Sequence, residues 1–281
     1  MTLLVAWRDT QTIHLAADSR LRSFVGTGGA ADVGAKVVPL DCRIQGPSPA
    51  RGSPAWVQSR RLGLAVAGSV TTAAVLQATL GSVLTSLSSI AGGGIDMEAI
   101  GSVVEAVFQQ VTRDVCTAIF QNGLAELIVC GYCDTARRAR AFLLDIDATA
   151  YPIRATTTEI LTTAGVEYRG SGRPAAVAAA RSGTPPLAVL KQVILNPNVQ
   201  AVGGAVQYGR IEGQDFRLFL VRDYEADHTA RTVRVAVFAH GLPVYGTVDL
   251  TLPAGYVVAG RAIDPFAQDI NALISQGYQV S

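Results

Sequence analysis

The chain has 281 residues, enough for one large domain with a substantial core or for two small ones. Its formal net charge is +1 and its Lys and Arg residues form no run, so charge does not indicate binding to nucleic acid or to an anionic membrane. Hydrophobic residues make up 49% and charged residues 16%. This balance is typical of a membrane protein or of a subunit that buries much of its surface in an assembly.

The uncharged stretch 62–95 is where the membrane alternative has to be tested. Hydroxyl and amide side chains interrupt it, so it holds no window of roughly 20 predominantly apolar residues. The N-terminal residues 1–9 have no basic region ahead of their short apolar run and do not resemble a signal peptide. We therefore expect no membrane partner and a cytoplasmic location.

Strands are expected in the first quarter of the chain, at residues 3–7, 12–17, 36–40 and 62–67. The polar residues 8–11 between the first two strands have the length of a hairpin turn. The stretch 41–60 is rich in Pro, Gly and Ser, which predicts an inserted loop. Gly68 ends the fourth strand.

Two consecutive helices are expected next. Residues 70–90 are uncharged and rich in Ala, Leu and Val, so we expect both sides of this helix to be covered. In residues 96–121 apolar side chains recur at three- and four-residue steps, which predicts an amphipathic helix. Asp96 is placed to cap this helix, and Asn122-Gly123 to end it.

The later part of the chain repeats this order of elements. Strands are expected at 127–131, 141–145 and 151–155, helices at 174–181 and 185–195, and strands at 205–211, 216–222 and 232–239. Helices that arrive in pairs are not the crossovers of a parallel sheet. We therefore predict an α+β fold, a four-layer αββα sandwich in which two antiparallel sheets lie between helix pairs.

The division of the chain is predicted from the weakening of these patterns. Residues 1–222 are expected to form the main domain, with 41–60 as its inserted loop. Residues 223–281 are expected to form a C-terminal extension that adds strands and one short helix, at 265–276, to the same domain.

The cysteines offer one candidate site of a different kind. Cys130 and Cys133 form a CxxC pair, a spacing found in redox and zinc sites. A zinc site needs two more ligands, and the three histidines stand apart from one another in the sequence. Cys130 also closes an apolar run. We expect both cysteines to be structural, with no metal and no cofactor.

Five short motifs follow one another in an order found in one known family. They are Thr2-Leu-Leu-Val-Ala, Leu15-Ala-Ala-Asp-Ser-Arg20, Val66-Ala-Gly68, Leu127-Ile-Val-Cys-Gly-Tyr132 and Gly170-Ser-Gly-Arg-Pro174. Together they resemble the proteasome β subunit and its bacterial relatives HslV and the Anbu branch. The resemblance covers about residues 2–222, and it implies the fold of an N-terminal nucleophile (Ntn) hydrolase.

Thr2 is the predicted nucleophile. A threonine hydroxyl needs a base to take its proton, and a free α-amine, with a pKa of about 8, is a base on the same residue. Removal of Met1 would expose that amine. Taken alone, a threonine at position two is more often incidental, but Asp18, Lys36 and Gly68 favour the catalytic interpretation.

The resemblance implies a role for each of the other candidate residues. Lys36 would lower the pKa of the Thr2 hydroxyl, and Asp18 would pair with Lys36 and orient it. Gly68 would supply a backbone N–H to the oxyanion, and Ser171 would hydrogen-bond the terminal amine. Lys36 is one of only two lysines in the chain, and arginine could not serve where an adjustable pKa is needed.

Three more residues are expected to lie near the substrate: Arg20, Val66 and Val70. The two valines favour apolar substrate side chains. One stretch departs from the family pattern, because residues 198–204 have no carboxylate where many proteasome subunits carry Asp-x-x-Ser-Gly to support the terminal amine.

The predicted function is that of a threonine-type peptidase or amidohydrolase subunit in a self-assembled ring, possibly a stack of rings, acting on peptides or unfolded proteins. The identity of an unfoldase partner stays open. Two alternatives also stay open. One is a catalytically inactive ring or scaffold subunit. The other is an amidase or acyl-transferring enzyme of the same fold that acts on a small molecule.

Overall fold

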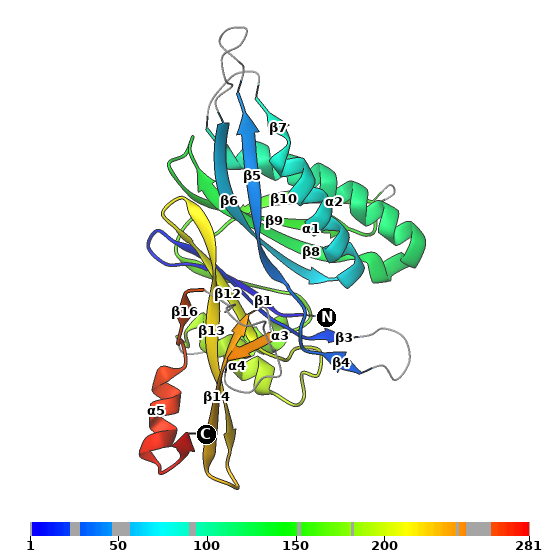
Figure 1. Cartoon of the computed structure of the whole chain (residues 1–281). Coiled ribbons are helices and arrows are strands. Elements are labelled where there is room, and N and C mark those ends of the chain that lie inside the picture. The colour runs from blue at the N-terminus through cyan, green and yellow to red at the C-terminus, as the bar shows by residue number, and fades with distance from the viewer. Residues whose placement is uncertain are drawn as a thin grey trace, which may run out of the picture.

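The computed structural model describes residues 2–22, 29–46, 57–89, 94–150, 153–180, 183–239, 242–245 and 260–280. Within these ranges the chain forms five α-helices, two large β-sheets and one two-stranded ribbon. Figure 1 shows the two sheets one above the other, with helices beside each. The mixed α+β class predicted from the sequence is confirmed.

One large sheet has six strands in the order β10-β9-β8-β6-β5-β7. Its strands are β5 (Val37–Gln45), β6 (Val57–Gly68), β7 (Leu87–Ser88), β8 (Ala125–Cys133), β9 (Arg138–Asp147) and β10 (Arg154–Ile160). The short β5–β7 pair is parallel, whereas the other neighbours are antiparallel.

The other large sheet has nine strands, seven of them in the order β11-β1-β2-β12-β13-β14-β15. These are β1 (Leu4–Arg8), β2 (Ile13–Asp18), β11 (Gly165–Arg169), β12 (Val206–Glu212), β13 (Asp215–Asp227), β14 (Thr232–Ala239) and β15 (Leu242–Tyr245). Two short strands, β16 (Ala262–Ile263) and β17 (Gln279–Val280), pair in parallel with β13 and β14. The separate ribbon consists of β3 (Leu21–Arg22) and β4 (Ala30–Ala31).

The helices are α1 (Val70–Thr85), α2 (Met97–Ile119), α3 (Arg173–Ala179), α4 (Pro186–Leu195) and α5 (Ala267–Ser275), and a 3-10 turn, η1 (Phe120–Gly123), follows α2. Asp96 caps α2 as expected, because its side chain accepts a hydrogen bond from the backbone N–H of Glu98. Prolines stand in the first turns of α3 and α4, where the missing N–H costs nothing.

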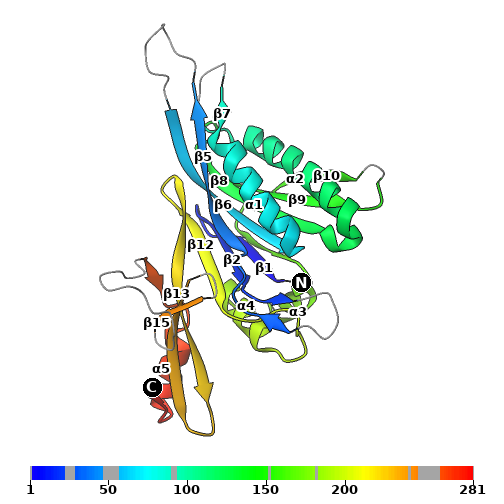
Figure 2. The same ribbon diagram turned by 45° about the vertical axis from the view of Figure 1, so that its right-hand side comes forward.

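Three groups of buried side chains make up the core. The first joins α1 and α2 to the six-stranded sheet, with Phe108 among its largest members. The second lies between the two sheets and includes Leu15 and Ile128. The third joins α3 and α4 to the nine-stranded sheet and includes Leu190. Figures 1 and 2 show α1 and α2 together on one half of the molecule and α3 and α4 on the other.

The prediction of an inserted loop at 41–60 is wrong at both ends of that range. Strand β5 continues to Gln45 and β6 begins at Val57, and only residues 47–56 lie outside the described ranges. In β5 the buried Cys42 and Ile44 alternate with exposed residues, so the stretch keeps the period of two that a half-buried strand requires. The Pro, Gly and Ser residues that suggested a loop are concentrated between the two strands.

Other elements differ from expectation in detail. The strand expected at 151–155 is β10, which begins at Arg154, and β11 was not expected. Helix α1 was expected to be covered on both sides, but in the single chain its buried residues fall on one side and Val75 is exposed. The short helix expected in the tail is confirmed as α5. The expected domain boundary at residue 222 lies inside strand β13.

The helices of the structure bear on whether the chain could cross a membrane. Within the described ranges, no helix combines the length and the apolar character that a bilayer crossing requires.

His14 on β2 gives the fold an expected pH dependence. Its ring is buried, stacks on Trp7 with centroids 4.7 Å apart, and lies 2.8 Å from the Tyr208 hydroxyl and 2.9 Å from Asp9 Oδ2. Burial lowers the pKa of His14, with a smaller contribution from Arg210, although Asp9 opposes the shift. The unfolded chain therefore binds this proton more readily than the folded one.

The stability that neutral His14 contributes is present above its unfolded pKa, near 6.5, and is lost as the pH falls below that value. We expect the free energy of unfolding, measured in urea, to be lower at about pH 5.5 than at about pH 7.5. Part of that difference should disappear in His14→Gln. An equal pH dependence in the two proteins would contradict the prediction.

Candidate functional site

The site is centred on Thr2, which is 3% exposed and precedes β1. Its backbone N–H donates to Ser171 Oγ at 3.2 Å, and its carbonyl oxygen accepts from the Gly172 N–H at 3.2 Å. Gly170 has a φ of +85°, and a Cβ on it would lie 2.3 Å from the Thr2 carbonyl oxygen. Only glycine fits at position 170. Through the two hydrogen bonds, the turn 170–172 holds both the N–H and the carbonyl group of Thr2.

Asp18, at the end of β2, is 0% exposed and accepts four hydrogen bonds. Its Oδ1 accepts from the Leu3 N–H at 2.9 Å and from Lys36 Nζ at 2.9 Å. Its Oδ2 accepts from the N–H groups of Gly203 at 3.1 Å and Arg20 at 3.2 Å. These four donors hold the carboxylate in place, and the carboxylate in turn fixes the direction of the Lys36 side chain.

Lys36 is 5% exposed and immediately precedes β5. Its backbone N–H donates to Gln207 Oε1 at 3.0 Å, and the same oxygen accepts from the Val37 N–H at 3.2 Å. Burial lowers the pKa of the Lys36 ammonium, while the charge of Asp18 opposes the shift. The side chain is thus a partly desolvated cation whose proton is easier to move than that of an exposed lysine.

Gly68 ends β6 with a φ of +102°, and a Cβ on it would lie 2.5 Å from the Leu124 carbonyl oxygen. The next residue, Ser69, donates its N–H to that same oxygen at 2.9 Å and caps α1. The strand-to-helix turn at this point therefore requires glycine, and it places the positive end of the α1 dipole beside the site.

Two cavities meet at Thr2, and Thr2, Ala67, Gly68 and Ser69 line both. The smaller has a volume of about 210 Å³ and is also lined by Lys36, Val66 and Val70 among others. The larger, of about 600 Å³, reaches to Glu126, Asp145, Arg169 and Ser171. An extended chain lying over Thr2 would have room on either side of it.

All the candidate residues named from the sequence come together in the structure. Thr2, Lys36 and Gly68 share the smaller cavity, Ser171 contacts Thr2, and Asp18 stands behind Lys36. Arg20, Val66 and Val70 line the smaller cavity too. The Arg20 guanidinium is held by Asp32, with nitrogen–oxygen distances of 2.7 and 2.9 Å.

Sequence reasoning missed Gln207 and Gly203. Gln207 on β12 is buried and accepts from two consecutive backbone N–H groups at the start of β5. A glutamine between two apolar residues in the predicted strand 205–211 was the signal that could have pointed to it. Gly203 lies in the stretch 198–204 that lacks a carboxylate, and here its backbone N–H binds Asp18. Its carbonyl oxygen accepts from the N–H groups of Ser19 and Arg20.

Cys130 and Cys133 are buried free thiols. Burial raises the pKa of Cys130 to about 12, so its thiol stays protonated near neutral pH. No cluster of three or more His, Cys, Asp or Glu side chains suited to a metal occurs in the described ranges. The CxxC pair belongs to the core, as expected.

The fold, but not the sequence, is similar to that of known proteins. No protein-family model matches the chain, and no curated protein does. Among solved structures, the helical assembly of the Anbu complex from Pseudomonas aeruginosa matches 77% of this chain and 85% of its own, at 14% identity and a TM-score of 0.50. The chain has the Anbu fold.

Two further Anbu structures are similar at lower scores. Anbu from Yersinia bercovieri, described as an ancestral β-subunit, is 15% identical, with 74% of this chain and 80% of that chain covered and a TM-score of 0.49. A Gly-1 mutant of Anbu from Hyphomicrobium sp. strain MC1 is 18% identical, with 75% and 82% covered and a TM-score of 0.48. The fold shared with the Pseudomonas aeruginosa Anbu structure confirms the resemblance that the five motifs predict.

Proposed function

We propose that this protein is a proteasome-like subunit that, once Met1 is removed, cleaves amide bonds with Thr2 as nucleophile. The observation that carries the proposal is the place of Thr2. It lies where two cavities meet, and one of them is lined by Lys36, whose ammonium is buried against Asp18. Such a cation beside a hydroxyl favours the alkoxide form during attack.

The proposed reaction follows the chemistry of an N-terminal nucleophile. The free amine of Thr2 takes the Oγ proton, and Oγ attacks the substrate carbonyl carbon. The Gly68 N–H and the nearby α1 terminus stabilise the oxyanion. When the C–N bond breaks, the leaving amine receives the proton, which leaves an acyl ester on Oγ. Water then hydrolyses the ester and restores Thr2.

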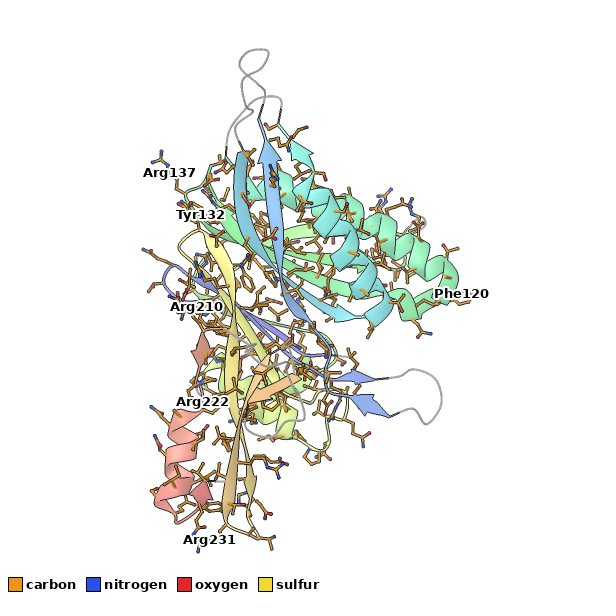
Figure 3. The ribbon with its side chains drawn as sticks, in the orientation of Figure 1. Phe120, Tyr132, Arg137, Arg210, Arg222 and Arg231 are labelled. Carbon is orange, nitrogen blue, oxygen red and sulfur yellow. The ribbon has the colours of Figure 1, made fainter. Side chains whose placement is uncertain are left out.

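We also propose that copies of the chain assemble with one another. The exposed side of α1 is uncharged and includes Val75, and Phe120 at the end of α2 is 78% exposed and points away from the body of the molecule (Figure 3). Assembly would cover such side chains. For each subunit we propose the four-layer αββα sandwich, and the three groups of core residues, one between the sheets and one under each helix pair, support it.

The proposed substrates are peptides or unfolded chains. The smaller cavity offers Val66, Val70 and Ala73 to one substrate side chain, which favours a small apolar group there. An extended backbone could continue past Thr2 into the larger cavity.

The test is the intact mass of the purified protein before and after incubation with a peptide epoxyketone. This reagent forms a stable ring only where a nucleophilic hydroxyl and a free α-amine share one residue. We expect the mass of Met1 to be missing and one adduct to form per chain. Thr2→Ala should be processed but should form no adduct, and Thr10→Ala, in the β1–β2 turn, should react like the unaltered protein.

The other outcomes separate the alternatives. A chain that retains Met1 would overturn the catalytic proposal. A chain that has lost Met1 but forms no adduct would favour a non-catalytic subunit. The absence of a carboxylate in 198–204 supports that alternative. An adduct accompanied by turnover of small amides, but not of peptides, would indicate an amidase of the same fold.

A further inference from the structure

Glu126 connects the six-stranded sheet to the turn 170–172, which follows β11 of the nine-stranded sheet and holds Thr2. It lies on β8 of the six-stranded sheet, where the β6–β8 register pairs it with Ala67 and pairs its neighbour Ala125 with Gly68. Its half-buried side chain lines the larger cavity beside Thr2. Its Oε2 accepts a hydrogen bond from the Gly170 N–H at 2.9 Å.

This hydrogen bond acts on the part of the turn that has least freedom. Gly170 has a left-handed backbone and packs directly against the Thr2 carbonyl group. The two residues that follow it, Ser171 and Gly172, make hydrogen bonds with the Thr2 backbone. A displacement of the Gly170 N–H would therefore move both groups that hold Thr2.

We infer that Glu126 is a positioning residue for Thr2, an inference that rests on the proposed function. Its carboxylate group accepts the Gly170 N–H, and a hydrogen bond to a carboxylate is roughly twice as strong as one between neutral groups. Through that bond it holds the turn 170–172 against the nucleophile. The stretch 198–204 has no carboxylate with which to support the same region.

The other account of Glu126 is that it only ties the two sheets together. That account predicts a loss of global stability with unchanged reactivity in the folded fraction. Positioning predicts a local change at the turn and a slower chemical step, with little change in the affinity for the reagent.

The experiment compares Glu126→Ala and Glu126→Gln in the full chain, with Glu105→Ala as control. Glu105 lies on α2 and lines neither cavity beside Thr2. Amide hydrogen exchange is followed at residues 168–173. The rate of epoxyketone labelling is measured against reagent concentration, to separate the maximal rate from the half-saturating concentration.

We expect Glu126→Ala to speed exchange at residues 170–172 and to slow the maximal labelling rate, each by about tenfold, with the half-saturating concentration changed by less than about threefold. Glu126→Gln keeps an acceptor oxygen and should lie closer to the unaltered protein. Glu105→Ala should change neither quantity.

Exchange in Glu126→Ala that is unaltered at 170–172, or labelling that is unaltered per folded chain, would overturn the inference. If the unaltered protein takes no label, the proposed function fails. The positioning inference then fails as a statement about catalysis, while the exchange result still decides whether Glu126 holds the turn.

Discussion

Replacing Asp18 by Asn is expected to lower the free energy of unfolding by about 3–5 kcal/mol. Asp18 and Lys36 form an ion pair in which both side chains are buried, so the substitution leaves a buried ammonium without its counter-charge. An Asn side chain also has one acceptor oxygen in place of two, while four donors surround the position. Urea unfolding at constant pH measures the change.

The matched control is Asp32→Asn, which removes a carboxylate that is also ion-paired but more exposed. Asp32 pairs with Arg20, but its side chain is 41% exposed and water screens the pair. We expect this substitution to cost less than about 1 kcal/mol. If the two variants unfold at the same urea concentration, the buried ion pair does not support the site as described.

Lys36→Arg is expected to slow epoxyketone labelling of Thr2 by about 100-fold or more while the protein stays folded. Arginine keeps the positive charge near Asp18, but its guanidinium is larger, keeps its proton at all accessible pH values and does not fit where an ammonium fits. The labelling rate is followed by intact mass, and folding is checked by the melting temperature.

Lys191→Arg provides the comparison, because Lys191 is the other lysine of the chain and also forms a buried pair. Lys191 lies on α4, and its Nζ is 2.5 Å from Asp223 Oδ1. Lys191 lines neither cavity at Thr2. We expect Lys191→Arg to label at the unaltered rate per folded chain. Equal losses in the two variants would mean that Lys36 acts through stability alone.

Much of the site could be predicted because its residues lie in short motifs whose order along the chain is informative. Thr2 and Asp18 belong to such motifs, and the pairing of Asp18 with Lys36 is found as expected. Gln207 and Glu126 could not be placed in the same way. Their partners are set by strand register and by the approach of two sheets, neither of which has a local pattern in the sequence.

The same distinction explains the fold. Helix α2 was predicted to within two residues because its apolar side chains keep one period over six turns. Strands β10 and β11 carry few buried residues, so the alternation that identifies a strand is weak in them. In β5 the composition of the adjoining segment hid an alternation that was present.

The position of β1 has a consequence during synthesis of the chain. Residue for residue, β1 pairs with β2 on one side and with β11, which ends at Arg169, on the other. The strand that follows Thr2 in the chain is therefore not enclosed until more than half of the polypeptide has been synthesised. During that interval a peptidase can reach the bond between Met1 and Thr2, whereas Thr2 of the folded protein is almost wholly buried.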